Sequence, residues 1–174
     1  MKSQLTYIDL FAGAGGLSEG FIRAGFIPIA HVEQNTAACF TLKTRMAYYY
    51  LKQQNKESIY FSYLKGEINR SKFYSHIPSE ILDTVINKKI GKDNPLIFKT
   101  IDSLLGNNNI DLIIGGPPCQ AYSYSGRAAL KHKKKDERNI LYIQYGRFLK
   151  KYSPKVFVFE NVPGLLNAGN GKFY

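Results

Sequence analysis

The chain has 174 residues, with 24 Lys and Arg against 13 Asp and Glu, and therefore a formal net charge of +11. Hydrophobic residues make up 44% of it, which excludes an intrinsically disordered chain and suits one domain with its own core. Two cysteines are too few for a disulfide scaffold and lack metal-ligand spacing with the three histidines, so we expect a reducing compartment and no metal. No apolar run approaches the ~18 residues that span a bilayer, which predicts a soluble, cytoplasmic protein without a membrane partner.

The basic residues are concentrated near the end of the sequence. Residues 1–30 are neutral overall, whereas residues 131–155 hold nine basic and two acidic side chains and so supply +7 of the net charge. A basic balance of this kind favours a polyanionic partner, most simply nucleic acid, although a basic run is often only a solvated surface. Because this run follows the cysteine-containing motif at 115–123, we favour the interpretation that it contacts nucleic acid.

The apolar pattern predicts the elements in chain order. They are a strand at 6–11, a helix at 17–24, a strand at 26–32, helices at 36–51 and 79–88, a strand at 112–114, a helix at 140–151 and a strand at 156–159. Strand–helix alternation of this kind predicts a doubly wound, mostly parallel α/β sheet. Residues 41–96, rich in Tyr, Lys and Asn, interrupt the alternation, and we expect them to form a peripheral insertion.

The first motif is DLFAGAGGLSEGF, at residues 9–21. Gly13 and Gly15 at a strand-to-helix turn allow close backbone approach to a ligand, although Ser18 replaces the third glycine of a dinucleotide fingerprint. Glu33 comes twenty residues after Gly13, at the end of the second strand, where a carboxylate can bind ribose hydroxyls. This glycine turn alone is weak support, since many such turns are purely structural.

The second and third motifs also follow predicted strands. GGPPCQAYS, at 115–123, places Cys119 on a loop that two prolines stiffen. A free cysteine is more often a buried small hydrophobe than a nucleophile, but the prolines, the glycine pair and the basic run favour a reactive thiolate here. Glu160, followed by Asn161, is either a solvated strand-end carboxylate or a general acid at the same sheet edge as Cys119.

Together these strings resemble the DNA (cytosine-5) methyltransferase family. The family's cofactor motif is similar to DLFAGAGGLSEGF, its catalytic loop to GGPPCQAYS, and its following motif to FENV, while residues 136–141 and the helix after them are similar to its next block. The resemblance covers nearly the whole chain apart from 41–96. It implies a Rossmann-like S-adenosylmethionine-dependent methyltransferase fold, incomplete at the C-terminus, in a prokaryotic restriction–modification protein.

The resemblance also implies a role for each matching residue. Cys119 would attack carbon 6 of a cytosine flipped out of double-stranded DNA, Glu160 would protonate or hydrogen-bond ring nitrogen 3, and carbon 5 would take the methyl group of S-adenosylmethionine. Asn161 would orient the catalytic loop. The residues implied to bind the cofactor are Phe11, Gly13, Gly15, Gly16, Glu33, Pro118 and Leu141. Those implied to contact DNA or the base are Gln120, Ser123, Arg127, Lys133 and Lys134.

The sequence departs from the family in three ways. The acidic residue that contacts the cofactor's adenine has two candidate positions, Thr100 and Asp102, and Gln34 stands where an aromatic residue often stacks. The family's later parts, including its target-recognition region, are absent. We therefore expect a partial catalytic domain over 1–174, as a fragment, a truncated product or one half of a split enzyme completed by a second polypeptide, with little activity alone.

Two other functions stay open. Cytosine-5 methylation of RNA uses the same catalytic strings, and a non-catalytic nucleic-acid-binding remnant would need only the basic run at 131–155. A nucleotide-dependent oxidoreductase is disfavoured because the glycine fingerprint is incomplete and PPCQ has no role in it.

Overall fold

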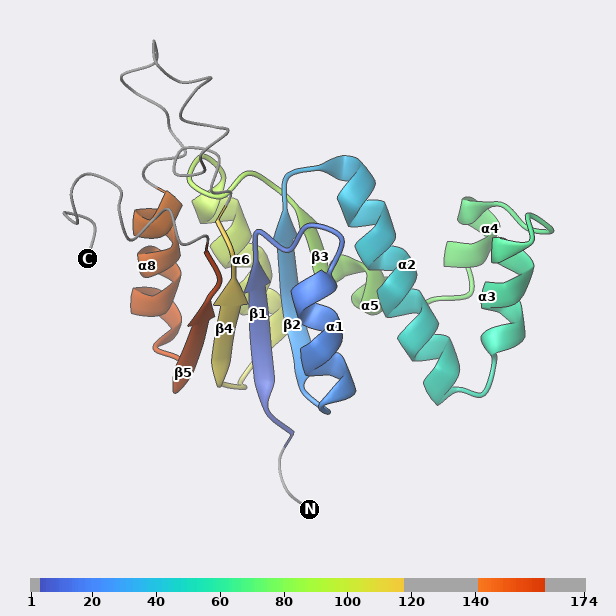
Figure 1. The fold of residues 1–174 in the computed structure, drawn as a ribbon, viewed down its shortest axis with the longest axis horizontal. Coiled ribbons are helices and arrows are strands. Elements are labelled where there is room, and N and C mark those ends of the chain that lie inside the picture. The colour runs from blue at the N-terminus through green and yellow to red at the C-terminus, as the bar shows by residue number, and fades with distance from the viewer. Residues whose placement is uncertain (1–3, 118–140, 162–174) are drawn as a thin grey trace, which may run out of the picture.

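The computed structural model describes residues 4–117 and 141–161, which form a parallel sheet covered by helices on both faces (Figure 1). The strands are β1 (Thr6–Leu10), β2 (Ile27–Glu33), β3 (Val85–Asn87), β4 (Leu112–Gly115) and β5 (Val156–Phe159). The helices are α1 (Gly16–Arg23), α2 (Thr36–Gln53), α3 (Glu57–Leu64), α4 (Arg70–Tyr74), α5 (Ser79–Asp83), α6 (Asn94–Leu105) and α8 (Leu141–Tyr152).

The strand order is β3-β2-β1-β4-β5, and every paired strand is parallel. The chain builds outward from β1 to β3, then returns to the other side of β1 for β4 and β5, which confirms the predicted doubly wound fold. Parallel strands end at one edge of the sheet, called here the carboxyl edge, and begin at the opposite amino edge. The point where the strand order reverses lies between β1 and β4, and ligands of such sheets bind there, beyond the carboxyl edge.

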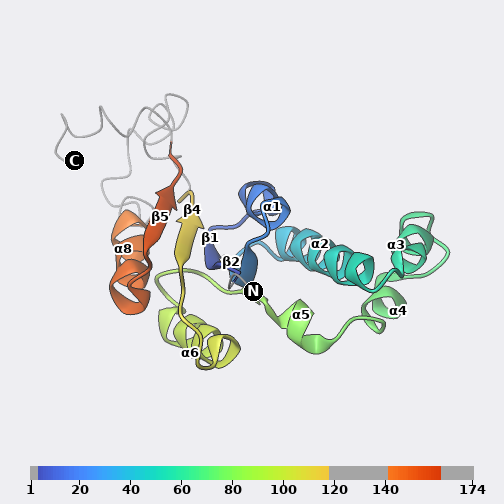
Figure 2. The same cartoon turned by 90° about the horizontal axis from the view of Figure 1, so that it is seen from below.

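The two faces of the sheet are buried by different helices, as Figure 2 shows: α1 lies on one face, and α6 and α8 lie on the other. Side chains alternate along each strand, so β1 directs Tyr7 and Asp9 to the α1 face and Ile8 and Leu10 to the opposite face. All four are almost inaccessible to solvent. Burial on both sides explains why the central strands appear in the sequence as nearly continuous apolar runs.

The prediction of one helix over 79–88 is wrong in its second half. Helix α5 ends at Asp83, and Val85 and Ile86 belong to β3, where they pair with His31 and Val32 of β2. Both residues are β-branched and buried, and their packing in the sheet outweighs the helical pattern. The sequence also failed to predict α6, although Pro95 stands in its first turn and Ile97 and Ile101 are spaced by one turn on its buried side.

The segment 41–96 contains both sheet and peripheral structure. It holds most of α2, and β3 lies within it as an edge strand of the sheet. Helices α3 and α4 lie beyond the end of α2 that is farthest from the sheet (Figure 1). They are held there by an aromatic cluster in which the rings of Tyr63 and Phe73 stack at 4.6 Å. Whether 41–96 is an insertion relative to the family stays a prediction.

None of the helices in the described ranges has the length and apolar character needed to cross a membrane.

Candidate functional site

Four strand ends bring the described parts of the three motifs to the carboxyl edge. The glycine turn follows β1, Glu33 ends β2, Gly116 and Pro117 follow β4, and Glu160 follows β5. In the register of the sheet, Leu10 of β1 lies beside Gly115 of β4, which lies beside Phe159 of β5. The motifs are therefore neighbours in space although about 150 residues of sequence separate the first from the last.

The turn after β1 adopts a backbone that glycine favours. Phe11, Gly13 and Gly15 have φ angles of 58°, 54° and 84°, and Gly15 is the residue that caps the start of α1. A Cβ at Gly15 would stand 2.7 Å from a methyl carbon of Leu42 in α2, so glycine also permits close packing of α1 against α2. A Cβ at Gly13 would meet no atom of the described residues within 4 Å. Open space beside Gly13 is where a ligand can approach the backbone.

Glu33 joins the end of β2 to this turn. Its Oε2 accepts a hydrogen bond from the backbone N–H of Gly13 at 2.9 Å, and its Oε1 accepts one from the N–H of Asn35 at 2.6 Å. A carboxylate has about four acceptor positions, so the bonds to described residues leave two for further donors such as a pair of hydroxyl groups. The half-buried Glu33 is therefore fixed in place and still able to bind a ligand.

Asp9 is a functional candidate that sequence reasoning missed. It is 1% exposed, and its Oδ2 has no hydrogen-bond partner among the described residues. Burial, and secondarily the charge of Glu33, raises the pKa of Asp9 to about 8, so the carboxyl group is mostly protonated near neutral pH. The signal in the sequence was an acidic residue inside an otherwise apolar strand, which is uncommon unless the acid is paired or neutral.

A buried polar chain on the α1 face lies beside Asp9. His31 Nε2 is 2.8 Å from the hydroxyl oxygen of Ser18 in α1, which is hydrogen-bonded in turn to the hydroxyl of Tyr7. Burial lowers the pKa of His31 to about 4, so its imidazole is neutral near pH 7. These residues lie inside the fold, and their arrangement attaches α1 to β1 and β2 rather than forming a site open to substrate.

The chain leaving β4 is in contact with the residue after β5. The backbone N–H of Glu160 donates to the carbonyl oxygen of Gly115 at 3.0 Å, and the exposed Glu160 carboxylate lies against Gly116. A Cβ at Gly116 would collide with Glu160 Oε2, and one at Gly115 would collide with the carbonyl oxygen of Leu10. The two glycines therefore allow β1, β4 and β5 to end close together.

Helix α8 is anchored to these strand ends by Tyr145, which sequence reasoning also missed. Its hydroxyl is within hydrogen-bond distance of the carbonyl oxygens of Ile113, at 2.9 Å, and Val158, at 3.1 Å. Leu141, predicted to border the cofactor, is the first residue of α8 and is half-buried. Tyr145 thus fixes the position of Leu141 along the direction of strands β4 and β5.

Several predicted residues lie outside the described ranges. They are Pro118, Cys119, Gln120, Ser123, Arg127, Lys133 and Lys134. Their assignments stay predictions.

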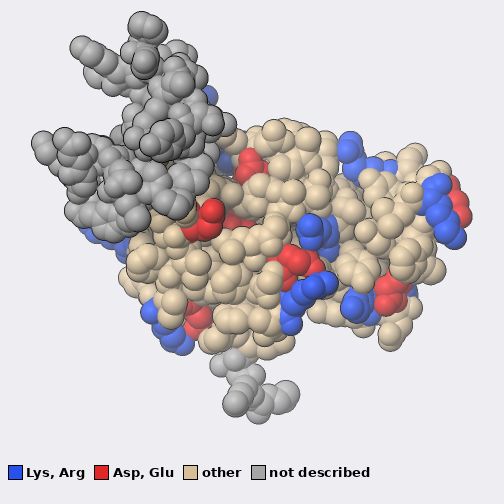
Figure 3. Space-filling view, viewed as in Figure 1, with Lys and Arg blue, Asp and Glu red and all other residues tan. Residues whose placement is uncertain are grey.

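The described end of the basic run lies away from the carboxyl edge. Lys151 pairs with Asp102 at 2.9 Å, and Lys155 pairs with Asp111 at 2.7 Å, both at the amino edge. On the face visible in Figure 3, Lys and Arg of the described residues are scattered rather than gathered in one patch. The two lysines are thus already paired with carboxylates, and the expected basic surface does not continue through them.

The two positions considered for contact with adenine both lie in helix α6. Thr100 and Asp102 lie in the second half of α6, which runs from the carboxyl edge back to the amino edge. Asp102 is bonded there to Lys151 and Tyr152. The residues that follow β3 at the carboxyl edge are instead 88–93.

Within the part of the chain that the structure describes, no group of three or more His, Cys, Asp or Glu side chains is placed to hold a metal ion.

The model of the C-5 cytosine-specific DNA methylase family matches residues 5–69 and 61–174. The chain belongs to this family. A type II methyltransferase of Bacillus paralicheniformis is 43% identical and aligns with 96% of this chain, and one from a Picosynechococcus strain is 32% identical and aligns with 95% of it. This chain spans only 42% and 51% of the length of those two relatives.

A solved structure from E. coli has a similar fold. It is described as a "putative DNA modification methyltransferase encoded within prophage", and its TM-score is 0.56 at 28% sequence identity. The similarity covers 95% of this chain and 34% of the E. coli chain. The parallel sheet and its helices are therefore those of the family's fold.

Proposed function

We propose that this chain binds S-adenosylmethionine and carries the catalytic residues for transfer of its methyl group to carbon 5 of cytosine in DNA. The observation that carries the proposal is the contact between the Glu160 carboxylate and Gly116, three residues before Cys119. The contact supports the proposal because Glu160 then lies beside β4, and Cys119 follows β4 in the sequence. Membership of the cytosine-specific methylase family supports the choice of base.

The carboxyl edge has hydrogen-bond acceptors and open space of the kind that the cofactor requires. The Glu33 carboxylate has free acceptor positions for the two ribose hydroxyls, and the open side of Gly13 permits close approach to the backbone. The aromatic face of Phe11, at the start of the turn, is suited to a positive sulfonium. Pro118 and Leu141 would border the bound molecule, and Gly16 would offer the free N–H of a helix start. S-adenosylmethionine supplies the methyl group to be transferred.

The covalent chain limits how far Cys119 can lie from this edge. Pro117 is buried directly after β4, and two residues of fully extended chain span at most about 7 Å. A thiol attached within that radius can reach a base that also contacts Glu160.

The proposed reaction uses both residues on one cytosine ring. The Cys119 thiolate would form a bond to carbon 6 while Glu160 donates a proton to nitrogen 3, so that electron density moves to carbon 5. Carbon 5 would accept the methyl group that bound S-adenosylmethionine supplies, with the methyl–sulfur bond breaking and S-adenosylhomocysteine as the leaving group, and would then lose its proton to a base. The electrons of that C–H bond would restore the ring double bond, the C6–S bond would break to release the Cys119 thiolate, and nitrogen 3 would return its proton to Glu160. Because carbon 6 is inaccessible in a stacked duplex, the cytosine must first be flipped out.

The test is a pair of cysteine substitutions in cells that encode the protein. Cys119→Ser should abolish 5-methylcytosine at one DNA sequence motif in genome-wide bisulfite sequencing. Cys39→Ala is the control, because Cys39 is 3% exposed inside the fold and should be dispensable for methylation. Unchanged methylation at every motif in the Cys119 variant would contradict the proposal, and loss confined to RNA would favour the RNA alternative.

A further inference from the structure

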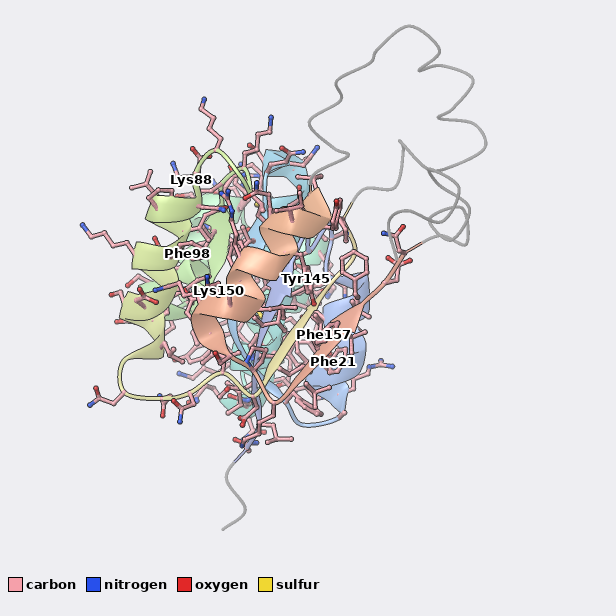
Figure 4. The ribbon with its side chains drawn as sticks, turned by 90° about the vertical axis from the view of Figure 1, so that its left-hand side faces the viewer. Phe21, Lys88, Phe98, Tyr145, Lys150 and Phe157 are labelled. Carbon is pink, nitrogen blue, oxygen red and sulfur yellow. The ribbon has the colours of Figure 1, made fainter. Side chains whose placement is uncertain are left out.

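Three contacts in line join helices α6 and α8, which lie side by side on one face of the sheet (Figure 4). Asn94 Nδ2 donates to Gln144 Oε1 at 3.0 Å, and the rings of Phe98 and Phe148 pack with centroids 4.8 Å apart. At the far end, Asp102 accepts hydrogen bonds from Lys151 and Tyr152. The residues are spaced by four in α6, and residues four apart lie on one side of a helix, so the contacts form a ladder along both helices.

The first contact of this ladder differs from the other two because both of its partners are buried polar groups. Asn94 is 4% exposed and Gln144 is 7% exposed, and their amides bond to each other fifty residues apart in the sequence. Asn94 Oδ1 also accepts the backbone N–H of Gly91 at 2.8 Å. One buried amide thus holds both the start of α8 and the loop at 88–93 that follows β3.

Both of the segments held by this amide pair lie at the carboxyl edge. Just before the loop at 88–93, Asn87 Nδ2 donates to the carbonyl oxygen of Glu33 at 3.1 Å, and the Lys88 N–H donates to the same oxygen at 3.1 Å. Leu141 lies one helical turn before Gln144. The loop therefore starts beside the backbone of Glu33, the residue assigned to the ribose, and Leu141 lies on the α8 side of the same edge.

We propose that Asn94 and Gln144 are positioning residues that set the spacing between the loop at 88–93 and Leu141, and so shape the slot for the purine end of the cofactor. The inference rests on the proposed function, because the slot exists only if S-adenosylmethionine binds at this edge. A base attached to a ribose on Glu33 would lie near the loop at 88–93, since the residues at the start of that loop bond to the Glu33 carbonyl oxygen. Neither residue touches the ligand in this arrangement.

The test compares two methionine substitutions in the same helix of the full chain. Gln144→Met keeps the length of the side chain but removes the acceptor, leaving the Asn94 amide buried without its partner. We expect the affinity for S-adenosylhomocysteine, measured by isothermal titration, to fall about tenfold. Lys151→Met breaks the contact at the opposite end of the ladder and should change that affinity less than about twofold. Gln144→Glu restores an acceptor oxygen for Asn94 and should recover most of the lost affinity.

Adenosine is the second probe, because it contains the purine and ribose without the amino-acid end. Gln144→Met should weaken adenosine and S-adenosylhomocysteine by the same factor. Equal losses in the two methionine variants, an unaffected Gln144→Met, or weakening of S-adenosylhomocysteine but not of adenosine would each overturn the inference while leaving the proposed function intact. Absence of S-adenosylhomocysteine binding to the wild-type chain would overturn both.

Discussion

Gly115 and Gly116 keep the exit from β4 free of side chains where it passes β1 and the end of β5. At Gly116 the atom nearest to an added Cβ is Oε2 of Glu160, at the tip of a flexible side chain, and the backbone oxygen of Glu160 is next, at 3.1 Å. A side chain of this kind can move aside at little cost in stability, but a moved carboxylate no longer occupies its original place. Gly116 therefore governs where the proposed acid lies more than how stable the fold is.

We predict that Gly116→Ala lowers DNA methylation at least about tenfold, because general acid–base groups contribute 10²- to 10⁴-fold when correctly placed. Gly146→Ala is the matched control: Gly146 is exposed in α8, a Cβ there would meet no described residue within 4 Å, and alanine favours a helix by about 0.5–1 kcal/mol relative to glycine. Bisulfite sequencing of cells with each variant measures the effect. Full methylation with Gly116→Ala would show that the position of Glu160 does not limit catalysis.

At the scale of elements, the turn from β1 to α1 uses its glycines in two ways. Gly13 and Gly15 both have positive φ, but a Cβ at Gly15 would press on the Leu42 side chain of α2. A Cβ at Gly13 would meet no atom within 4 Å in the part of the chain that the structure describes. Gly15 thus allows α1 to pack closely against α2, and Gly13 leaves space at the candidate site.

We predict that Gly15→Ala destabilises the protein by about 2–4 kcal/mol, the sum of a left-handed backbone penalty and a clash with Leu42. Gly13→Ala incurs only the backbone penalty, about 1 kcal/mol. Urea unfolding followed by circular dichroism measures both. Equal losses would mean that the Leu42 contact relaxes freely and does not fix α1 against α2.

For the whole molecule, two buried ionisable groups give the stability opposite responses to pH. His31 is neutral when folded, with a pKa of about 4 against 6.5 ordinarily, so its contribution is lost as pH falls from 6.5 towards 4. Asp9 is protonated when folded, with a pKa of about 8 against 3.8, so its contribution is lost as pH rises from 3.8 towards 8. Below pH 6.5 the two residues change the free energy of unfolding in opposite directions as the pH varies. Above pH 6.5 only the change due to Asp9 continues.

We predict that the free energy of unfolding falls by about 1 kcal/mol per pH unit between pH 6.5 and 8 because of Asp9. Asp9→Asn is neutral in both the folded and the unfolded chain and should remove that slope. Urea unfolding of wild type and variant over this range measures the difference, in which other titrating groups cancel. The same slope in both proteins would show that Asp9 is ionised in the folded state.

The sequence predicted the four longer strands because each is an apolar run ended by glycine or polar residues, and burial on both faces produces that pattern. It missed β3, whose three residues also fit a helical spacing and belong to the sheet only through pairing with β2. The strings around Gly13, Glu33 and Glu160 were enough to predict their common edge. The Asn94–Gln144 pair was beyond prediction, because neither amide carries a local signal and fifty residues separate them.

The two hydrogen bonds of Glu33 have a consequence for how a ligand is received. Gly13 and Asn35 hold the carboxylate in place through backbone hydrogen bonds. If Glu33 binds a ribose as proposed, the two hydroxyl groups would meet acceptor atoms that are already oriented, and the entropy cost of ordering that side chain would fall on folding rather than on binding. A ligand that lacks one of the two hydroxyl groups would then leave one carboxylate oxygen without a donor, which would favour ligands that carry both.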